Sequence, residues 1–276
     1  MLIDTKELNH WINHFYGYGS WHARIWFVAF EDGGGDLPEE VAEKLSYFYH
    51  AHAQHAEPTL CDIRALYRNC SFRWDGPKAD IYANLFEYRF GNNAIVSGVW
   101  KNLIAFVQGY KDAELPDMLN YQKHSLASLS TKNEALIKLF PLPSPHHHAW
   151  YYSWLDLPQF PFLKSRTLYQ EHVYTDRIRA LLDNMKAFRP EVVLLYGMNN
   201  INLLKTSVQE SFPGVVFKTV KAIKQKIPQH HRADINGTVL LITTQIPALR
   251  HNRVETGFDW EAFGKKVRDE TSVLRF

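Results

Sequence analysis

Two acidic side chains stand directly before three glycines in the segment 31–35, Glu-Asp-Gly-Gly-Gly. Consecutive glycines let the backbone approach a ligand closely and adopt positive φ. The segment is not a dinucleotide fingerprint, because Pro38 stands where the last glycine would fall, and no Gly-Lys-Ser/Thr of a phosphate-binding loop follows. Three further acids would repel a phosphate here: Asp36, Glu39 and Glu40. The pattern favours a general base or a cation site, and a plain strand-to-helix turn is the alternative.

The opposite charge collects in the segment 218–232, which has no acidic residue and these basic ones: Lys218, Lys221, Lys224, Lys226 and Arg232. Such a block predicts contact with a polyanion such as nucleic acid, and a solvated surface loop is the alternative. The chain as a whole has a formal net charge of +2, which excludes a histone-like polycation. The near neutrality is a cancellation between the acidic and the basic segment.

Histidines and aromatic residues gather in the segment 141–166, which contains His146-His147-His148 and six aromatic residues beginning at Trp150. Adjacent histidines in an extended segment point to alternate sides, so the run does not supply three ligands to one ion. His230-His231 are expected in a loop. We therefore expect no metal and no cofactor. The aromatic rings either stack on a planar ligand such as a base or close the core beneath the loop.

These side chains need a scaffold, and four short apolar runs predict its strands: residues 24–30, 134–140, 192–196 and 239–243. Each run is nearly continuous, which is typical of strands buried on both faces in a parallel sheet. A weaker run at 215–220 indicates an edge strand or a loop. Helical patterns lie between the runs, with predicted starts at Asp36, Thr167 and Asp259. The sequence thus predicts an α/β fold, a three-layer α-β-α sandwich around a central, mostly parallel four-stranded sheet.

The 276 residues, 46% hydrophobic and 22% charged, exclude wholesale disorder. The region 36–130 has helical patterns but no Gly/Ser-rich linker, so we expect one domain, 1–276, with a helical insertion around 36–130. Cys61 and Cys70 do not make a disulfide framework and are predicted to be buried thiols. The polar start and the lack of a long apolar run predict a cytoplasmic protein that binds no membrane. The oligomeric state stays open.

Ligands of an open parallel sheet bind beyond the carboxyl ends of the strands. The segments that should converge there are 31–35, 141–154, 197–200 and 244–251.

Taken in order, four segments resemble those of the uracil-DNA glycosylase superfamily. Residues 25–33 resemble its first motif, a strand ending in Gly-x-Asp/Asn-Pro. Residues 135–145 resemble the second strand, whose polar end residue reads the base, and 189–199 the third strand and glycine turn. Residues 241–250, with Thr-Thr-Gln-Ile-Pro-Ala, resemble the last motif, His-Pro-Ser. The match is confined to the strand ends.

The chain also departs from these motifs. Glu31 stands where the first motif has its water-positioning Asp or Asn, and Asp32 stands where that motif has its proline. Lys138 falls near the base-reading Asn and cannot accept a hydrogen bond. Ile246 falls at the final His, with His251 five residues further on as a substitute.

The resemblance implies a nucleic-acid protein that hydrolyses the N-glycosidic bond of a flipped base, a DNA repair activity. In it, Glu31 or Asp32 orients a water at C1′, and His251 or backbone N–H groups stabilise the departing base. The implied base pocket comprises Phe30, Gly33, Gly34, Lys138, Phe140, Trp150, Asn199 and Gln245. The implied backbone contacts are Lys218, Lys221, Lys224, Lys226, Arg232 and Arg250. The alternatives are a non-catalytic nucleic-acid- or nucleotide-binding module on the same fold, and a scaffold protein with an aromatic surface.

Overall fold

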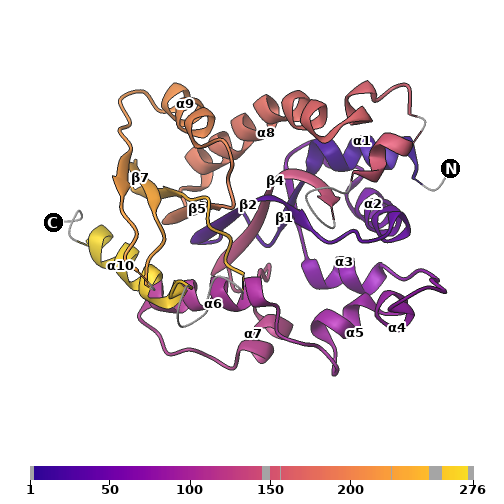
Figure 1. Cartoon of the computed structure of the whole chain (residues 1–276), viewed down its shortest axis with the longest axis horizontal. Helices are drawn as coiled ribbons and strands as arrows, with labels where there is room; N and C mark the ends of the chain where they lie inside the picture. Colours follow the sequence, from indigo (N-terminus) through magenta and orange to yellow (C-terminus); the bar gives the residue numbers. More distant parts are fainter. Residues whose placement is uncertain (1–2, 145–149, 156, 225, 249–256, 273–276) are drawn as a thin grey trace.

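An eight-stranded mixed sheet runs through the molecule in the order β3-β1-β4-β2-β5-β8-β7-β6 (Figure 1). The structure, a computed structural model, describes residues 3–144, 150–155, 157–224, 226–248 and 257–272. The strands are β1 (Phe15–Tyr18), β2 (Ile25–Gly33), β3 (Thr59–Cys61), β4 (Glu134–Ser144), β5 (Val192–Tyr196), β6 (Lys218–Val220), β7 (His230–Ile235) and β8 (Thr238–Ile242).

The four predicted strands form the centre of this sheet, in the order β4-β2-β5-β8, and all four are parallel. Phe27 of β2 pairs with Leu136 on one side and Leu194 on the other, and Leu194 pairs with Leu241. The α/β class is therefore confirmed, and the carboxyl ends of the four strands lie at one edge.

The prediction of a four-stranded sheet is wrong, because two strands extend each side of the centre and make the sheet mixed. Strands β1, β3 and β6 have only four, three and three residues, too few to give a readable pattern. The weak run at 215–220 does contain an edge strand, β6.

Strand β7 falls where the sequence predicts a loop, so the placement of His230-His231 in a loop is wrong. The segment pairs with β8 through a two-residue turn, Asn236 and Gly237, whose φ angles are 50° and 90°. Positive φ at both positions defines the turn for which Asn-Gly is the strongest sequence signal. The hairpin was thus readable from the sequence.

Helices cover both faces of the sheet, with α1, α8 and α9 on one side and α3, α5, α6, α7 and α10 on the other (Figure 1). Trp26 of β2 packs against Phe188 of α8 through Trp21, and the next residue, Phe27, packs against Phe106 of α6. Helix α2 packs against α1 and α3. The α-helices are α1 (Thr5–His14), α2 (Pro38–His52), α3 (Ile63–Asn69), α4 (Ala79–Ala83), α5 (Leu85–Phe90), α6 (Gly98–Lys111), α7 (Met118–His124), α8 (Arg166–Phe188), α9 (Ile201–Ser211) and α10 (Trp260–Ser272). Two 3-10 turns, η1 (Tyr151–Trp154) and η2 (Pro161–Lys164), precede α8.

Two of the three predicted helix starts are shifted. Asp36 does not cap α2, because its carboxylate instead accepts a hydrogen bond from the Tyr82 hydroxyl at 2.6 Å. Ser165, not Thr167, caps α8 by accepting from the Leu168 N–H. Asp259 does cap α10, since its carboxylate accepts from the Ala262 N–H at 2.9 Å.

Strand β4 is buried along its whole length of eleven residues. Cys61 and Cys70 are buried as predicted, and burial raises the pKa of the Cys70 thiol to about 12. The region 36–130 contains α2 to α7 and also β3, which joins the sheet by pairing with β1. Within the described residues, no helix combines the length and apolar character needed to cross a membrane.

Candidate functional site

A cavity of about 490 Å³ lies at the carboxyl ends of the central strands, between the sheet and helices α3, α5 and α6. Its strand side is lined by Tyr18, Ala29, Phe30, Glu31, Asp32, Gly33, Leu136, Lys138, Ser144, Tyr196, Gly197, Asn199 and Ile246. Its helical side is lined by Tyr67, Arg89, Ser97, Val99 and Trp100, and Arg166 of α8 lines it next to Glu31. Cavities of this size bind small molecules and cofactors in many proteins.

Glu31 is bound from α8. Arg166 donates to one carboxylate oxygen at 2.8 Å, and the Gln170 amide donates to the other at 2.7 Å. Arg166 also donates to the Ser144 hydroxyl at the end of β4 and packs over the Trp150 ring at 5.5 Å. This network joins the carboxyl end of β2 to the carboxyl end of β4 and holds the Glu31 carboxylate in place.

Asp32 forms the second carboxylate–cation pair. Its side chain is 6% exposed, and the Lys138 ammonium lies 2.9 Å from one oxygen. The other oxygen accepts from the Tyr18 hydroxyl at 3.3 Å. Burial opposes the charge on Lys138, but Asp32 and Tyr196 outweigh it, so the pKa of Lys138 is raised. Burial and Asp32 raise the pKa of Tyr18 well above its ordinary value, so this hydroxyl stays a donor.

A third pair lies beneath the glycines. Lys44, fully buried on α2, contacts the Glu40 carboxylate one turn away. A side chain at Gly34 would come within 4 Å of both groups. Gly35 has a φ of +70°, and a Cβ there would lie 2.9 Å from Val41, so only glycine fits.

These pairs correct the electrostatic picture of the 31–40 segment. Its acids were expected to repel a phosphate, but Glu31, Asp32 and Glu40 each have a cation brought by the fold: Arg166, Lys138 and Lys44. Two of those cations are far away in the sequence, so the local charge count was misleading.

Six of the expected site residues line the cavity: Phe30, Glu31, Asp32, Gly33, Lys138 and Asn199. Ile246, at the position of the motif histidine, also lines it and makes that part of the wall apolar.

Four expected pocket residues lie outside the lining. Phe140 packs behind Phe30, with ring centroids 4.9 Å apart. The Trp150 indole donates to the Leu163 carbonyl, so Trp150 supports Arg166 rather than facing a ligand. Gly34 covers the α2 pair. Gln245 lies behind the lining residue Gly197, whose N–H donates to the Gln245 carbonyl.

Arg250, His251 and the run His146-His147-His148 lie outside the described residues. The described residues contain no group of three or more His, Cys, Asp or Glu side chains arranged to hold a metal ion.

The four lysines Lys218, Lys221, Lys224 and Lys226, hereafter the basic segment, are exposed. Strand β6 runs antiparallel to β7, which runs antiparallel to β8. The connection after Val220 therefore emerges at the carboxyl edge of β8, the edge that holds the cavity. Three strand spacings separate β6 from β5, or about 14 Å.

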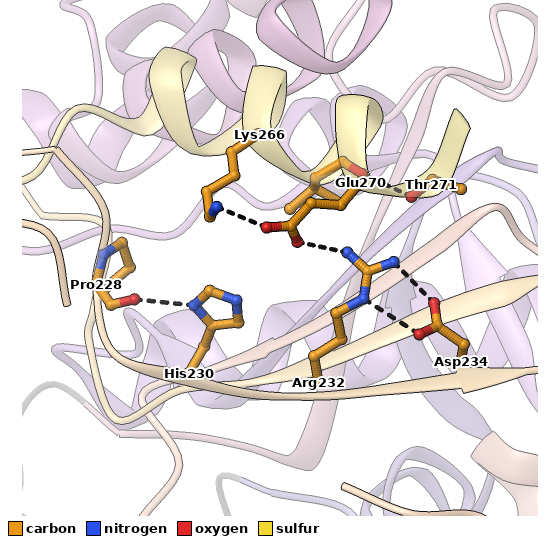
Figure 2. A network of polar contacts seen from close by, with 8 residues as sticks. Pro228, His230, Arg232, Asp234, Lys266, Glu270 and Thr271 are labelled. Atoms are coloured by element: carbon orange, nitrogen blue, oxygen red, sulfur yellow. Dashed lines mark hydrogen bonds and ion pairs between the residues drawn. The ribbon is translucent and has the colours of Figure 1, made fainter. Parts of the chain in front are cut away.

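Arg232 is not a free backbone contact, and its assignment to nucleic acid is wrong. Its side chain is 7% exposed and forms ion pairs with Asp234 and Glu270, each at 2.8 Å (Figure 2). Lys266 binds the second oxygen of Glu270, and His230 contacts the Pro228 carbonyl nearby (Figure 2). This network joins β7 to α10.

Five residues of this site were not predicted from the sequence: Tyr18, Arg89, Trp100, Arg166 and Gln170. Arg166 and Gln170 stand four residues apart, so a shared helix face was readable. Their partner Glu31 is more than a hundred positions away and was not.

The chain matches none of the protein-family models and none of the curated proteins with which it was compared.

Proposed function

We propose that the protein is a uracil-DNA glycosylase-like hydrolase that binds nucleic acid, takes a flipped base into the cavity and cleaves its N-glycosidic bond. The observation that carries the proposal is the meeting of the motif-like strand ends at one cavity. That cavity has aromatic walls and two carboxylates.

The cavity walls suit a planar ligand. Phe30, Trp100 and Tyr196 contribute aromatic rings, and a flipped base is commonly held by stacking between such side chains. Polar groups of the lining would read the base edge. Lys138 can donate to a base oxygen, and the Asn199 side chain can both donate and accept.

Asp32 is the carboxylate we assign to the reacting centre. A carboxylate has about four acceptor sites, and Lys138 and Tyr18 use two of those on Asp32. Asp32 orients a water and takes its proton while the water oxygen bonds to C1′. The N-glycosidic bond breaks, and its electron pair leaves with the base. Positive charge developing on the sugar is offset by Asp32, and the departing base anion by Lys138.

The basic segment supports a polymeric substrate over a free base. It emerges at the sheet edge that holds the cavity, about 14 Å from β5. One strand of nucleic acid could therefore contact the basic segment and the cavity together. Lysines placed this way bind phosphates without regard to sequence.

Binding without hydrolysis is a second candidate, favoured by two observations. Both oxygens of Glu31, the residue at the water-positioning place of the motif, are bound by Arg166 and Gln170. None of the described lining residues is a histidine.

The test is base release. Wild type, Asp32→Asn and Glu31→Gln are incubated with single- and double-stranded DNA containing uracil or hypoxanthine, and abasic sites are counted. We expect Asp32→Asn to lower the rate by about 10²- to 10⁴-fold, the usual contribution of a general base. Glu31→Gln should have a smaller effect. Asp183→Asn, an exposed carboxylate paired with Lys186, is the matched control.

Binding is measured alongside, as a function of salt. Replacing Lys221, Lys224 and Lys226 by Ala should reduce the salt slope by about 0.7 for each phosphate that the variant no longer neutralises. If wild type makes no abasic sites but binds with a salt-dependent affinity, the binding function replaces hydrolysis. If neither is found, the nucleic-acid proposal fails.

A further inference from the structure

The helical region 36–130 supplies one whole wall of the cavity, through Tyr67 of α3, Arg89 of α5 and Ser97 and Trp100 at the start of α6. The motif-like strand ends account for none of these residues. This wall differs from the opposite one in its charges, because its cation, Arg89, has no carboxylate partner among the described residues.

The described cavity lining has five charged side chains, and four of them form two pairs: Glu31 with Arg166 and Asp32 with Lys138. Arg89 is the fifth. No carboxylate in the described part of the chain lies within ion-pair distance of its guanidinium, which packs over the rings of Tyr88 at 4.9 Å and Trp100 at 5.8 Å. This lining therefore has one excess positive charge, and it is on Arg89.

Arg89 is held by a buried clamp. The Gln122 amide, fully buried, donates to the Arg89 carbonyl at 2.7 Å and to the Ile95 carbonyl at 3.0 Å. Its oxygen accepts from the Ser97 N–H at 2.9 Å. One side chain thus holds the backbone of Arg89 on α5 and of Ser97 at the start of α6.

Ser97 adds a hydrogen-bond donor. Its hydroxyl oxygen accepts from the Trp100 N–H, so its own proton is left for another acceptor. A guanidinium fork and a hydroxyl donor that line the same cavity are suited to phosphate oxygens. The acids of the opposite wall do not oppose such a ligand, because each is already paired with a cation.

We infer that Arg89 and Ser97 bind the phosphate of the nucleotide whose base enters the cavity, so that the ligand is a nucleotide phosphate rather than a free base or nucleoside. The inference rests on the base pocket of the proposed function. The phosphate belongs either to a free mononucleotide or to a phosphodiester of a strand, and Arg89 contacts the same oxygens in both.

The test compares ligands that differ only in the phosphate. Calorimetry measures wild type with deoxyuridine and deoxyinosine, and with their 5′-monophosphates. We expect the monophosphates to bind about 10- to 100-fold more tightly, the effect of charge-assisted hydrogen bonds. Arg89→Gln should remove that difference and leave nucleoside affinity unchanged, and Arg89→Lys should restore part of it.

Arg68→Gln is the matched control. Arg68 is an exposed arginine of α3 that packs over Phe86 at 4.4 Å, as Arg89 packs over its aromatic neighbours, but it does not line the cavity. It should bind all ligands like wild type. A uracil-containing single-stranded oligonucleotide forms the second arm. Tighter binding of the oligonucleotide than of the mononucleotide identifies the strand as the source of the phosphate.

Equal affinity of wild type for nucleoside and monophosphate overturns the inference and leaves the base pocket in place. The inference is also overturned if Arg89→Gln weakens the binding of nucleoside and monophosphate equally. Phosphate-dependent binding without abasic sites keeps the inference and overturns the hydrolysis. No binding of any ligand overturns both.

Discussion

The Arg232 network between β7 and α10 and the Asp32–Lys138 pair at the cavity both place a buried cation against acids. They differ in what surrounds the acids. Asp234 and Glu270 keep 45% and 35% of their side-chain exposure, whereas Asp32 keeps 6%. The first network is solvated on one side and joins two elements. The second borders the cavity, so the same ionic chemistry joins two elements in one place and faces an open volume in the other.

The largest effect on stability is expected from Lys138→Met. Removing this cation leaves the Asp32 carboxylate buried without its charge partner, which costs about 3–5 kcal/mol in comparable cases. Denaturant unfolding measures the loss. Lys138→Met/Asp32→Leu, which removes both charges, should recover much of it. A single variant as stable as wild type would mean that water reaches Asp32 well enough to replace the ion pair.

Arg232→Met should cost less, about 1–2 kcal/mol, because its two acids stay hydrated when the cation is gone. The same unfolding measurement checks this, and nucleic-acid binding should stay at the wild-type level. Weaker binding in a correctly folded Arg232→Met protein would return Arg232 to the set of ligand contacts and undo the distinction between the two networks.

The smallest effect is a pH dependence beside the Arg232 network. Burial lowers the pKa of His230 below its ordinary 6.5, with Arg232 and Lys266 acting in the same direction and the Pro228 carbonyl and Glu270 opposing. A histidine kept neutral by the fold contributes stability that is fully present above pH 6.5 and is lost as the pH falls towards the lowered value. Unfolding free energies should therefore fall less between neutral and mildly acidic pH in His230→Gln than in wild type. If the unfolding free energies of wild type and His230→Gln fall equally, His230 does not contribute to the acid sensitivity.

Continuous apolar runs made the four central strands predictable from the sequence, because burial on both faces leaves a pattern in the residues themselves. The rule that ligands bind beyond the carboxyl ends of parallel strands then placed Glu31, Asp32, Gly33 and Asn199 at one edge, and all four line the cavity. Phe30 and Lys138, which were expected from the family resemblance, line it as well. The short outer strands left no such pattern, and strand β7 is too polar to show one.

The residues that carry the charge of the site can be read from the chain alone, whereas the pairing of those charges is a property of the fold. The acidic loop was predicted to exclude phosphate, because a local count includes neither Arg166 nor Lys138. Arg232 was counted with the exposed lysines, and the fold instead buried it against two acids. Electrostatic energy depends on distance in space, and pairs separated by a hundred residues in the chain meet only after folding. For the same reason Arg89 is unremarkable in the sequence, and only the folded cavity sets it apart from the paired cations of the described lining.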